Sequence, residues 1–187
     1  VSRSMLATDL PPSRLSRAKL AAEDLIQQLR RPQKGKGVTR VGVVAFAGTA
    51  FLQAPVTTDY EAALAALHAL DTDLIPLPGT NISDALQVIS AAFKKSEGGQ
   101  KAVVLITDGE DLEKDAVKLA KELSQTLRVF TVGVGTKEGM VLSVPSARGG
   151  MEYVRDENGN VVMSRLDEGR LREIAEASGG FYTQLQS

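Results

Sequence analysis

Apolar residues recur along the chain in short runs and in helical stripes, and the two patterns alternate. Runs rich in β-branched residues predict three strands buried on both faces, at Val41 to Phe46, Lys101 to Thr107 and Arg128 to Val134. Ala50 to Ala54 is predicted to pair back as an edge strand. A last short strand is predicted at Phe181 to Thr183.

Apolar residues at helical spacing separate these strands. The predicted helices are one from Ser13, as N-cap, to Arg30, others starting at Asp59 and at Asn81 or Ser83, and two more at Leu112 to Leu127 and Leu166 to Ala177. Strands that alternate with helices argue for βαβ units. We therefore predict an α/β, Rossmann-like, doubly wound fold with a mostly parallel central sheet and helices on both faces.

The stretch from Met151 to Arg165 departs from this alternation. Glu152 to Arg155 and Val161 to Ser164 flank a turn that contains Asn158-Gly159, a strong hairpin signal because both residues tolerate positive φ. The sequence thus predicts a β-hairpin insertion near residues 151–165.

Length and charge narrow the classes of function. The chain has 187 residues, which is most simply one domain spanning 1–187. Its 22 Lys and Arg nearly balance 23 Asp and Glu, so no overall positive field points to nucleic acid. It has no cysteine and one histidine, His68, which we expect on the surface. Thiolate catalysis and zinc sites built on cysteine or several histidines are excluded.

Four oxygen-bearing side chains fall in loops that suit a cation. Ser2 and Ser4 open the chain, Thr80 precedes a predicted helix, and Asp108 follows a predicted strand. Ligands of open α/β sheets lie beyond the carboxyl ends of the strands, where these residues are expected. Hydroxyl and carboxylate oxygens suit a hard cation such as Mg²⁺ that keeps several waters.

In order and spacing these residues resemble the metal-ion-dependent adhesion site (MIDAS) of von Willebrand factor A (vWA) domains. The closer resemblance is to the bacterial aerotolerance (Bat) branch, on the segments Ser4-Met5-Leu6-Ala7-x-Asp9, Arg14-Leu15-x-Arg17-Ala18-Lys19, Phe46-Ala47-Gly48-x-Ala50-Phe51 and Leu105 to Asp111.

The resemblance implies roles for the four residues. Ser2, Ser4 and Thr80 would bind the metal directly and Asp108 through water. The motif's first aspartate would stand one position before Val1, so the chain begins inside the motif. In this family the open metal position accepts a carboxylate from a partner protein, so binding is the implied activity and no enzymatic activity is expected.

The resemblance also implies a setting. Bat-type proteins carry membrane helices beside this domain, which suggests the periplasmic, extramembrane part of a bacterial inner-membrane protein. It further suggests work alongside MoxR-type AAA+ ATPases.

The family's first strand would lie between Val41–Phe46 and Lys101–Thr107. Without it two strand edges are left unpaired, at a cost of roughly 1–3 kcal/mol per unsatisfied group. We expect the position to be filled by preceding residues, by a rearranged sheet, or by a neighbouring chain in a strand-swapped homodimer. A direct pairing of Val43 or Val44 with Val103 or Val104 would contradict this expectation.

Other interpretations remain open at this stage. The domain could be an assembly scaffold with a vestigial or empty metal site, or, less favoured, a metal-assisted enzyme with Asp108 as base. Glu110 and Asp111 are expected to be first-turn acids of the following helix, with support of the metal site as the alternative. The glycines from Gly133 to Gly139 match no phosphate-binding spacing.

Overall fold

The computed structural model describes residues 1–31, 37–72, 74–75, 77, 79–96, 98–110, 115–145, 150–155 and 158–185. In chain order the elements are the 3-10 turn η1 (Arg3–Leu6), α1 (Arg14–Arg30), β1 (Val41–Phe46), β2 (Ala50–Thr57), α2 (Tyr60–His68), α3 (Ile82–Lys94), β3 (Ala102–Thr107), α4 (Ala116–Leu123), β4 (Arg128–Gly133), β5 (Met140–Val141), β6 (Ser143–Pro145), β7 (Met151–Tyr153), β8 (Met163–Ser164), α5 (Glu168–Ala177) and β9 (Tyr182–Gln184).

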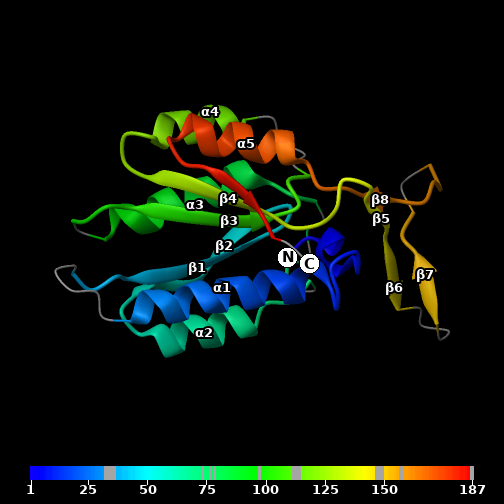
Figure 1. The fold of residues 1–187 in the computed structure, drawn as a ribbon, viewed down its shortest axis with the longest axis horizontal. Coiled ribbons are helices and arrows are strands. Elements are labelled where there is room, and N and C mark those ends of the chain that lie inside the picture. The colour runs from blue at the N-terminus through cyan, green and yellow to red at the C-terminus, as the bar shows by residue number, and fades with distance from the viewer. Residues whose placement is uncertain are drawn as a thin grey trace.

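The central strands form two sheets with helices on both sides. β3, β4 and β9 pair in parallel, with Leu105 opposite Thr131 and Thr131 opposite Tyr182. β1 and β2 form an antiparallel pair. Helices α1 and α2 lie on one side of the strands, and α4 and α5 on the other (Figure 1). The predicted α/β class with helices on both faces is confirmed.

A groove separates β1 from β3. Within the described residues, β1 pairs with β2 and β3 pairs with β4, so the direct β1 to β3 pairing that would contradict the expected gap does not occur. The groove has a volume of about 460 Å³ and is lined by β1, β3 and apolar residues of α1 and α3. Val104, in a strand predicted to be buried on both faces, is 40% exposed because it lies on the face of β3 that lines this groove.

The buried apolar residues also form separate clusters on the two sides of the groove. The largest cluster joins β3 and β4 to α3, α4 and α5 and includes the fully buried Ile82, Leu86, Val129, Leu171 and Ile174. A separate cluster of Ile26, Leu64 and Leu67 joins α1 to α2. No helix in the described ranges is long and apolar enough to cross a bilayer.

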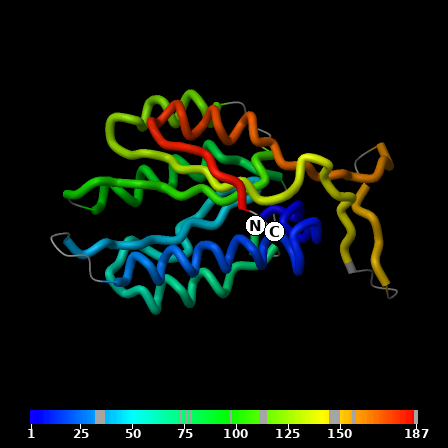
Figure 2. The backbone as a smooth tube through the Cα atoms, viewed as in Figure 1, coloured from blue at the N-terminus to red at the C-terminus, as the bar shows by residue number. Residues whose placement is uncertain are grey.

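A small β extension projects from one end of the molecule (Figures 1 and 2). β5 pairs with β8 and β6 with β7, all antiparallel. The predicted turn closes with an Arg155 to Val161 bridge and a bond from Val162 N to Val154 O of 2.9 Å. The predicted hairpin arms, however, pair mainly with residues 140–145, a neighbouring segment that supplies partners for their backbone groups.

Most helix starts follow the predicted caps. The side chains of Ser13, Asp59 and Asn81 accept hydrogen bonds from the first turns of α1, α2 and α3. Of the two candidates for α3, Asn81 is therefore the cap. The last helix begins at Glu168 rather than Leu166, capped by Asp167. The predicted start of α4 at Leu112 lies outside the described residues.

Candidate functional site

Ser2 and Ser4 lie at the start of η1. Ser2 is half-buried and Ser4 buried, and the Ser4 hydroxyl donates to Oγ of Ser2 at 3.2 Å. The turn itself is closed by a bond from Met5 N to Ser2 O of 3.1 Å. Two hydroxyl oxygens are thereby held side by side.

Thr80 lies in the loop before α3 and is 4% exposed. Its position is set by the next residue, because Asn81 N donates to Ala47 O at 2.8 Å just beyond the end of β1. Asn81 also caps α3 by accepting from Asp84 N at 2.8 Å. Thr80 is thus fixed between the carboxyl end of β1 and the amino end of α3.

Asp108 directly follows β3 and is 1% exposed. Its Oδ2 accepts from Arg14 Nη1 at 3.1 Å and lies 3.3 Å from Ser164 Oγ, whose single hydrogen can go either to Asp108 or to the closer Glu110. Its Oδ1 has a longer contact, 3.5 Å, with Oγ1 of Thr107. Gly109 follows with φ of 80°, and a Cβ there would lie 2.7 Å from the Asp167 carbonyl oxygen, so this turn requires glycine.

The segments that carry Ser2, Ser4 and Asp108 meet at the carboxyl ends of β3 and β4. Met5 of η1 packs with Val134, which follows β4, and with Ile106 near the end of β3. η1 lies at the end of the molecule toward which β3 and β4 run (Figure 1). Val1 and Leu185 contact this same cluster, so the two chain ends also lie here (Figure 2).

The contacts within the predicted set are limited. Ser2 and Ser4 are joined directly, as given above. In the described part of the chain, the side-chain hydrogen bonds of Asp108 go to Arg14, Ser164 and Thr107, and none joins it to Ser2, Ser4 or Thr80.

Arg14, the first residue of α1, is fully buried beside Asp108. Its Nε and Nη2 donate to Oδ1 and Oδ2 of Asp9 at 2.8 and 2.7 Å. Nη1 donates to Asp108 and also to Oγ of Ser164 at 2.6 Å, and Nη2 donates to the Ser164 carbonyl at 3.3 Å. Arginine has five N–H groups, and each therefore has an acceptor here.

Two further contacts complete the surroundings of Arg14. Gly135 has φ of 125°, and a Cβ there would lie 2.8 Å from Cζ of Arg14, so the glycine lets the backbone pack against the guanidinium. Oδ2 of Asp9 also accepts from the amide and the hydroxyl of Thr136, at 2.9 and 3.0 Å. Burial alone would raise the pKa of Asp9, but Arg14 and Thr136 outweigh it and lower that pKa.

Glu110 differs from its prediction. It does not belong to the first turn of α4, which begins at Ala116, and its carboxylate instead accepts from Ser164 Oγ and Arg165 N, both at 2.9 Å. The helix dipole therefore has no part in placing it. Burial is the main cause that raises the pKa of Glu110, with the charge of Asp108 adding to it. Asp111 lies outside the described residues.

The sequence prediction used Arg14 and Asp9 only as parts of a motif and assigned no role to Ser164. One local signal was available: a cation in the first turn of a helix is unfavourable because of the helix dipole. Arg14 stands there and needs acidic partners to offset that cost. The distant partners Asp108 and Ser164 could not be inferred from spacing along the chain.

The hydroxyl and carboxylate oxygens of the four predicted residues are of the type that a hard cation binds. For the Ser2 and Ser4 hydroxyls, the distance between the two oxygens also suits such a cation. Adjacent oxygens around an octahedral Mg²⁺ at about 2.1 Å lie about 3.0 Å apart. The 3.2 Å between Ser2 Oγ and Ser4 Oγ is close to that value. From the part of the chain that the structure describes, Oδ1 of Asp108 receives just the long Thr107 contact, so it keeps lone pairs for a further ligand. Within the described ranges, no cluster of three or more His, Cys, Asp or Glu suggests another metal site.

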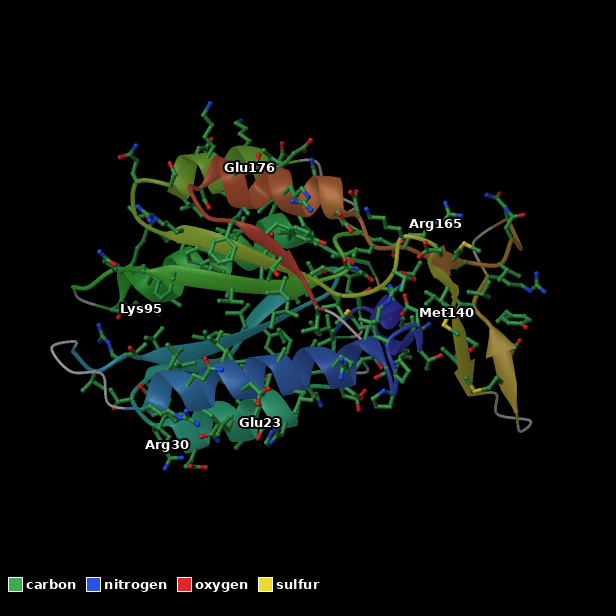
Figure 3. The ribbon with its side chains drawn as sticks, viewed as in Figure 1. Glu23, Arg30, Lys95, Met140, Arg165 and Glu176 are labelled. Atoms are coloured by element: carbon green, nitrogen blue, oxygen red, sulfur yellow. The ribbon has the colours of Figure 1, made fainter. Side chains whose placement is uncertain are left out.

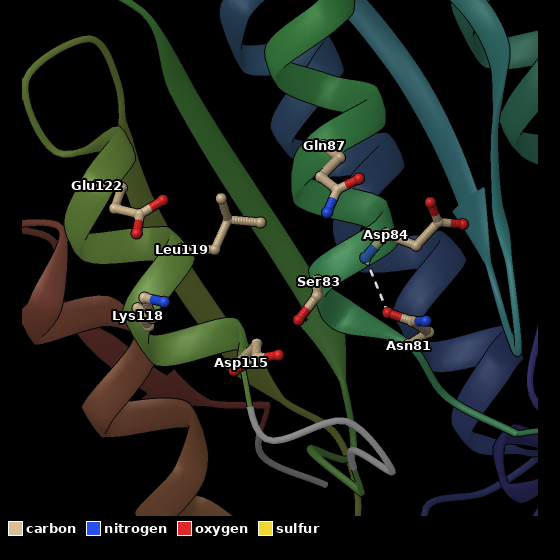
Figure 4. A pocket seen from close by; sticks show the side chains of 8 residues that line it. All are labelled: Asn81, Ser83, Asp84, Gln87, Asp115, Lys118, Leu119 and Glu122. Carbon is tan, nitrogen blue, oxygen red and sulfur yellow. Dashed lines mark hydrogen bonds between the residues drawn. The ribbon is translucent and has the colours of Figure 1, made fainter.

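A second, polar cleft of about 490 Å³ lies between α3 and α4. It is lined by Asn81, Ser83, Asp84, Gln87, Asp115, Lys118, Leu119 and Glu122 (Figure 4). The Ser83 hydroxyl is buried without a hydrogen-bond partner. None of the four predicted metal residues lines this cleft.

Comparison with known proteins places the chain in a family. A family model described as von Willebrand factor type A domain matches residues 1–110. A UPF0353 protein of Nocardia farcinica is 34% identical over 202 residues, covering 98% of this chain and 55% of that protein. The chain thus spans about half the length of the curated relatives it matches.

Solved structures agree. The conserved hypothetical protein BatB from Bacteroides thetaiotaomicron has a TM-score of 0.89 and 37% identity, covering 100% of this chain and 87% of that one. An aerotolerance-related membrane protein from Bacteroides fragilis, with multiple mutations to serines, has a TM-score of 0.84 and 37% identity, covering 100% and 88%. Proximal thread matrix protein 1 from the mussel byssus, at TM-score 0.63 and 19% identity over 91% and 36%, shares the fold alone.

The family model, the relative and the BatB structure each match long stretches of the chain, and they agree with its α/β fold. The chain belongs to the von Willebrand factor type A domain family, in the branch of BatB and the aerotolerance-related proteins.

Proposed function

We propose that the chain is a metal-ion-dependent protein-binding module. Ser2, Ser4, Thr80 and Asp108 would hold Mg²⁺ or another divalent cation, and the cation would take a carboxylate from a partner protein. The observation that supports this most is the 3.2 Å spacing of the Ser2 and Ser4 hydroxyl oxygens. The same fold holds a metal in the mussel protein, whose MIDAS motif is occupied by zinc.

The chemistry of the four residues favours binding over catalysis. A cation held mainly by neutral hydroxyl groups keeps affinity for an added carboxylate. Binding that carboxylate is the one chemical contribution that the metal would make here. Oδ2 of Asp108 is already occupied by the hydrogen bond from Arg14, and the contacts of this carboxylate are those of a held ligand. The chain's one histidine, His68, is bonded to Glu23 at 3.0 Å on an exposed face of α2.

The proposed partner is a protein that presents an acidic side chain, within a MoxR-type AAA+ ATPase system. The proposed setting is the periplasmic side of a bacterial inner membrane, with the domain held by membrane segments of a longer protein. Two observations support this setting: the relatives are about twice as long as the chain, and one structural neighbour is described as a membrane protein.

Isothermal titration with Mg²⁺ tests the proposal. The titration is run on the 187-residue chain and on a form extended by the sequence encoded ahead of Val1, where the motif aspartate is expected. We expect heat from the extended form, lost in Thr80→Ala and Asp108→Asn and kept in the control Thr126→Ala, a threonine in the turn after α4. An extended wild type without heat, checked for folding by circular dichroism, overturns the metal-dependent function.

A specific observation favours a second candidate function, that of an assembly scaffold. The groove between β1 and β3 offers two unpaired strand edges and an apolar lining to an extended segment of a second copy. In this alternative the metal site is vestigial or empty. Self-association of the 187-residue chain without added metal supports it, and a monomer at all concentrations rejects it.

A further inference from the structure

We propose that Arg14 is a positioning residue of the candidate cation site, holding the Asp108 carboxylate so that Oδ1 faces the cation. The inference rests on the proposed function. It concerns a residue that binds neither the metal nor the partner and acts through Asp108.

The first step is that Arg14 donates a hydrogen bond to one carboxylate oxygen of Asp108, Oδ2, and not to the other, Oδ1. Nη1 of Arg14 and Oγ of Ser164 both reach Oδ2, at 3.1 and 3.3 Å. Among the described residues, Oδ1 has the 3.5 Å contact with Thr107 and no other hydrogen bond. A carboxylate fixed through one oxygen cannot rotate freely, so the direction of the other oxygen is also fixed.

The second step is that Arg14 is itself held from several sides. Asp9 binds it with both carboxylate oxygens, and Ser164 accepts through its hydroxyl and its carbonyl. Gly135 packs against the guanidinium plane. Five donors in a rigid fork, each with an acceptor, leave the group no second arrangement.

The third step is that the network reaches the β extension. Ser164 belongs to β8, and its hydroxyl also bonds Glu110, whose other oxygen accepts from Arg165 N. Thr8 Oγ1 donates to Sδ of Met140 in β5 at 3.4 Å. Met140 and Arg165 lie where the extension joins the body (Figure 3). The extension thus supplies part of the support for Asp108.

The chemistry of lysine gives a clear test. Arg14→Lys keeps the charge but replaces the planar fork by a single ammonium group, which cannot hold Asp9 with two parallel bonds and reach Asp108 as well. Ser164→Ala removes the hydroxyl contact to Oδ2 and the hydroxyl that accepts from Nη1 of Arg14, but it keeps both Asp9 contacts of Arg14 and the Ser164 carbonyl. Arg30→Lys, on an exposed arginine of the same helix, is the matched control.

Two measurements separate positioning from a general loss of structure. Mg²⁺ affinity is measured by calorimetry on the extended form, at a temperature where circular dichroism shows each variant folded. We expect Arg14→Lys to weaken binding by about tenfold or more, as for other residues that orient a metal ligand, Ser164→Ala by less, and Arg30→Lys not at all. The side-chain rotamer of Asp108 is measured by NMR three-bond couplings without metal, and we expect one rotamer in the wild type and averaging in Arg14→Lys.

Each outcome decides something. A folded Arg14→Lys with wild-type affinity and a wild-type Asp108 rotamer overturns the inference. If the wild type binds no Mg²⁺, the proposed function falls, and the rotamer comparison alone decides whether Arg14 positions Asp108. If Arg14→Lys does not fold, the same two measurements on Ser164→Ala decide, and an unchanged rotamer with unchanged affinity overturns the inference.

Discussion

At the scale of single residues, Asp9 shows how a charge can be kept in a nearly closed site. Its side chain is 8% exposed, and it accepts two hydrogen bonds from Arg14 and two from Thr136. A carboxylate with these donors is more stable ionised than protonated, which is why its pKa is lowered despite burial.

This lowered pKa predicts part of the acid sensitivity of the protein. Because the pKa of Asp9 is lower in the folded state than its ordinary value of 3.8, ionised Asp9 stabilises the fold above that value. The contribution is lost as the pH falls through the folded-state pKa. We expect Asp9→Asn to be less stable at neutral pH and to lose less stability than the wild type on acidification, measured by urea unfolding across this range.

Asp24→Asn, at an exposed carboxylate of α1, serves as the control for the Asp9 measurement. It should retain the pH dependence of the wild type. The same acid slope in the wild type and in Asp9→Asn would contradict the expected role of Asp9.

The predicted residues show what a sequence can reveal about such a site. Ser2, Ser4, Thr80 and Asp108 were predicted from their loops beside strand and helix signals and from the order of a family motif. The structure packs η1, which contains Ser4 and follows Ser2, against the end of β3, next to Asp108, and the role of the four as metal ligands stays a prediction. Arg14 was not assigned a role, because its partners Asp108 and Ser164 lie 94 and 150 positions away. Pairing at that distance depends on the completed fold.

At the scale of elements, the sequence predicted most helix caps correctly but did not predict which strands of the β extension pair with each other. The caps of α1, α2 and α3 were predicted because a capping side chain bonds an amide within three residues of itself. β7 and β8 were predicted to pair with each other, yet they pair with β6 and β5. The Asn158-Gly159 turn signal was real, but it does not say which strand supplies the remaining hydrogen bonds.

The cap of α3 yields a prediction at this scale. Asn81 bonds Asp84 N, so Asn81→Ala should lower the free energy of unfolding by roughly 0.5–2 kcal/mol, while Asn81→Asp should keep most of the stability. Asp115 stands at the N-cap of α4 without such a bond, which makes Asp115→Ala the matched control with a smaller expected loss. Urea unfolding measures all three, and equal losses at the two caps would contradict the role of the Asn81 bond.

At the scale of the whole molecule, the sequence predicted that a strand is missing between β1 and β3 and that its position is filled, whereas among the described residues that position is an open groove. The strands on its two sides were predicted from their apolar runs, and the gap from the strand expected between them. Strands β1 and β3 are incompletely buried because of the same gap. Ala102 and Val104 are exposed on β3, and β1 is only partly buried. Apolar surface of this kind favours an added partner.

The scaffold function predicts that the groove drives self-association. Val104 on its rim and Val161 on the extension are both 40% exposed, so they form a matched pair. A lysine in the apolar groove would be costly to bury, and we expect Val104→Lys to weaken self-association by about tenfold or more, with Val161→Lys unchanged. Sedimentation velocity over a range of concentrations measures both, and an equal effect at the two positions would show that the groove is not the contact.

Helix α3 has a consequence for how the molecule unfolds. It packs against β1 and β2 on one side and against α4 on the other, while the two sheets share no strand pairing among the described residues. Together with the Arg14 contacts and the cluster around Met5 and Val134, α3 therefore joins the two halves into one cooperative unit. Proteins open in such units, and the units separate when the links between them weaken. Because α3 also contributes Ile82 and Leu86 to the largest core cluster, loosening α3 would both weaken that core and free the β1–β2 half from it.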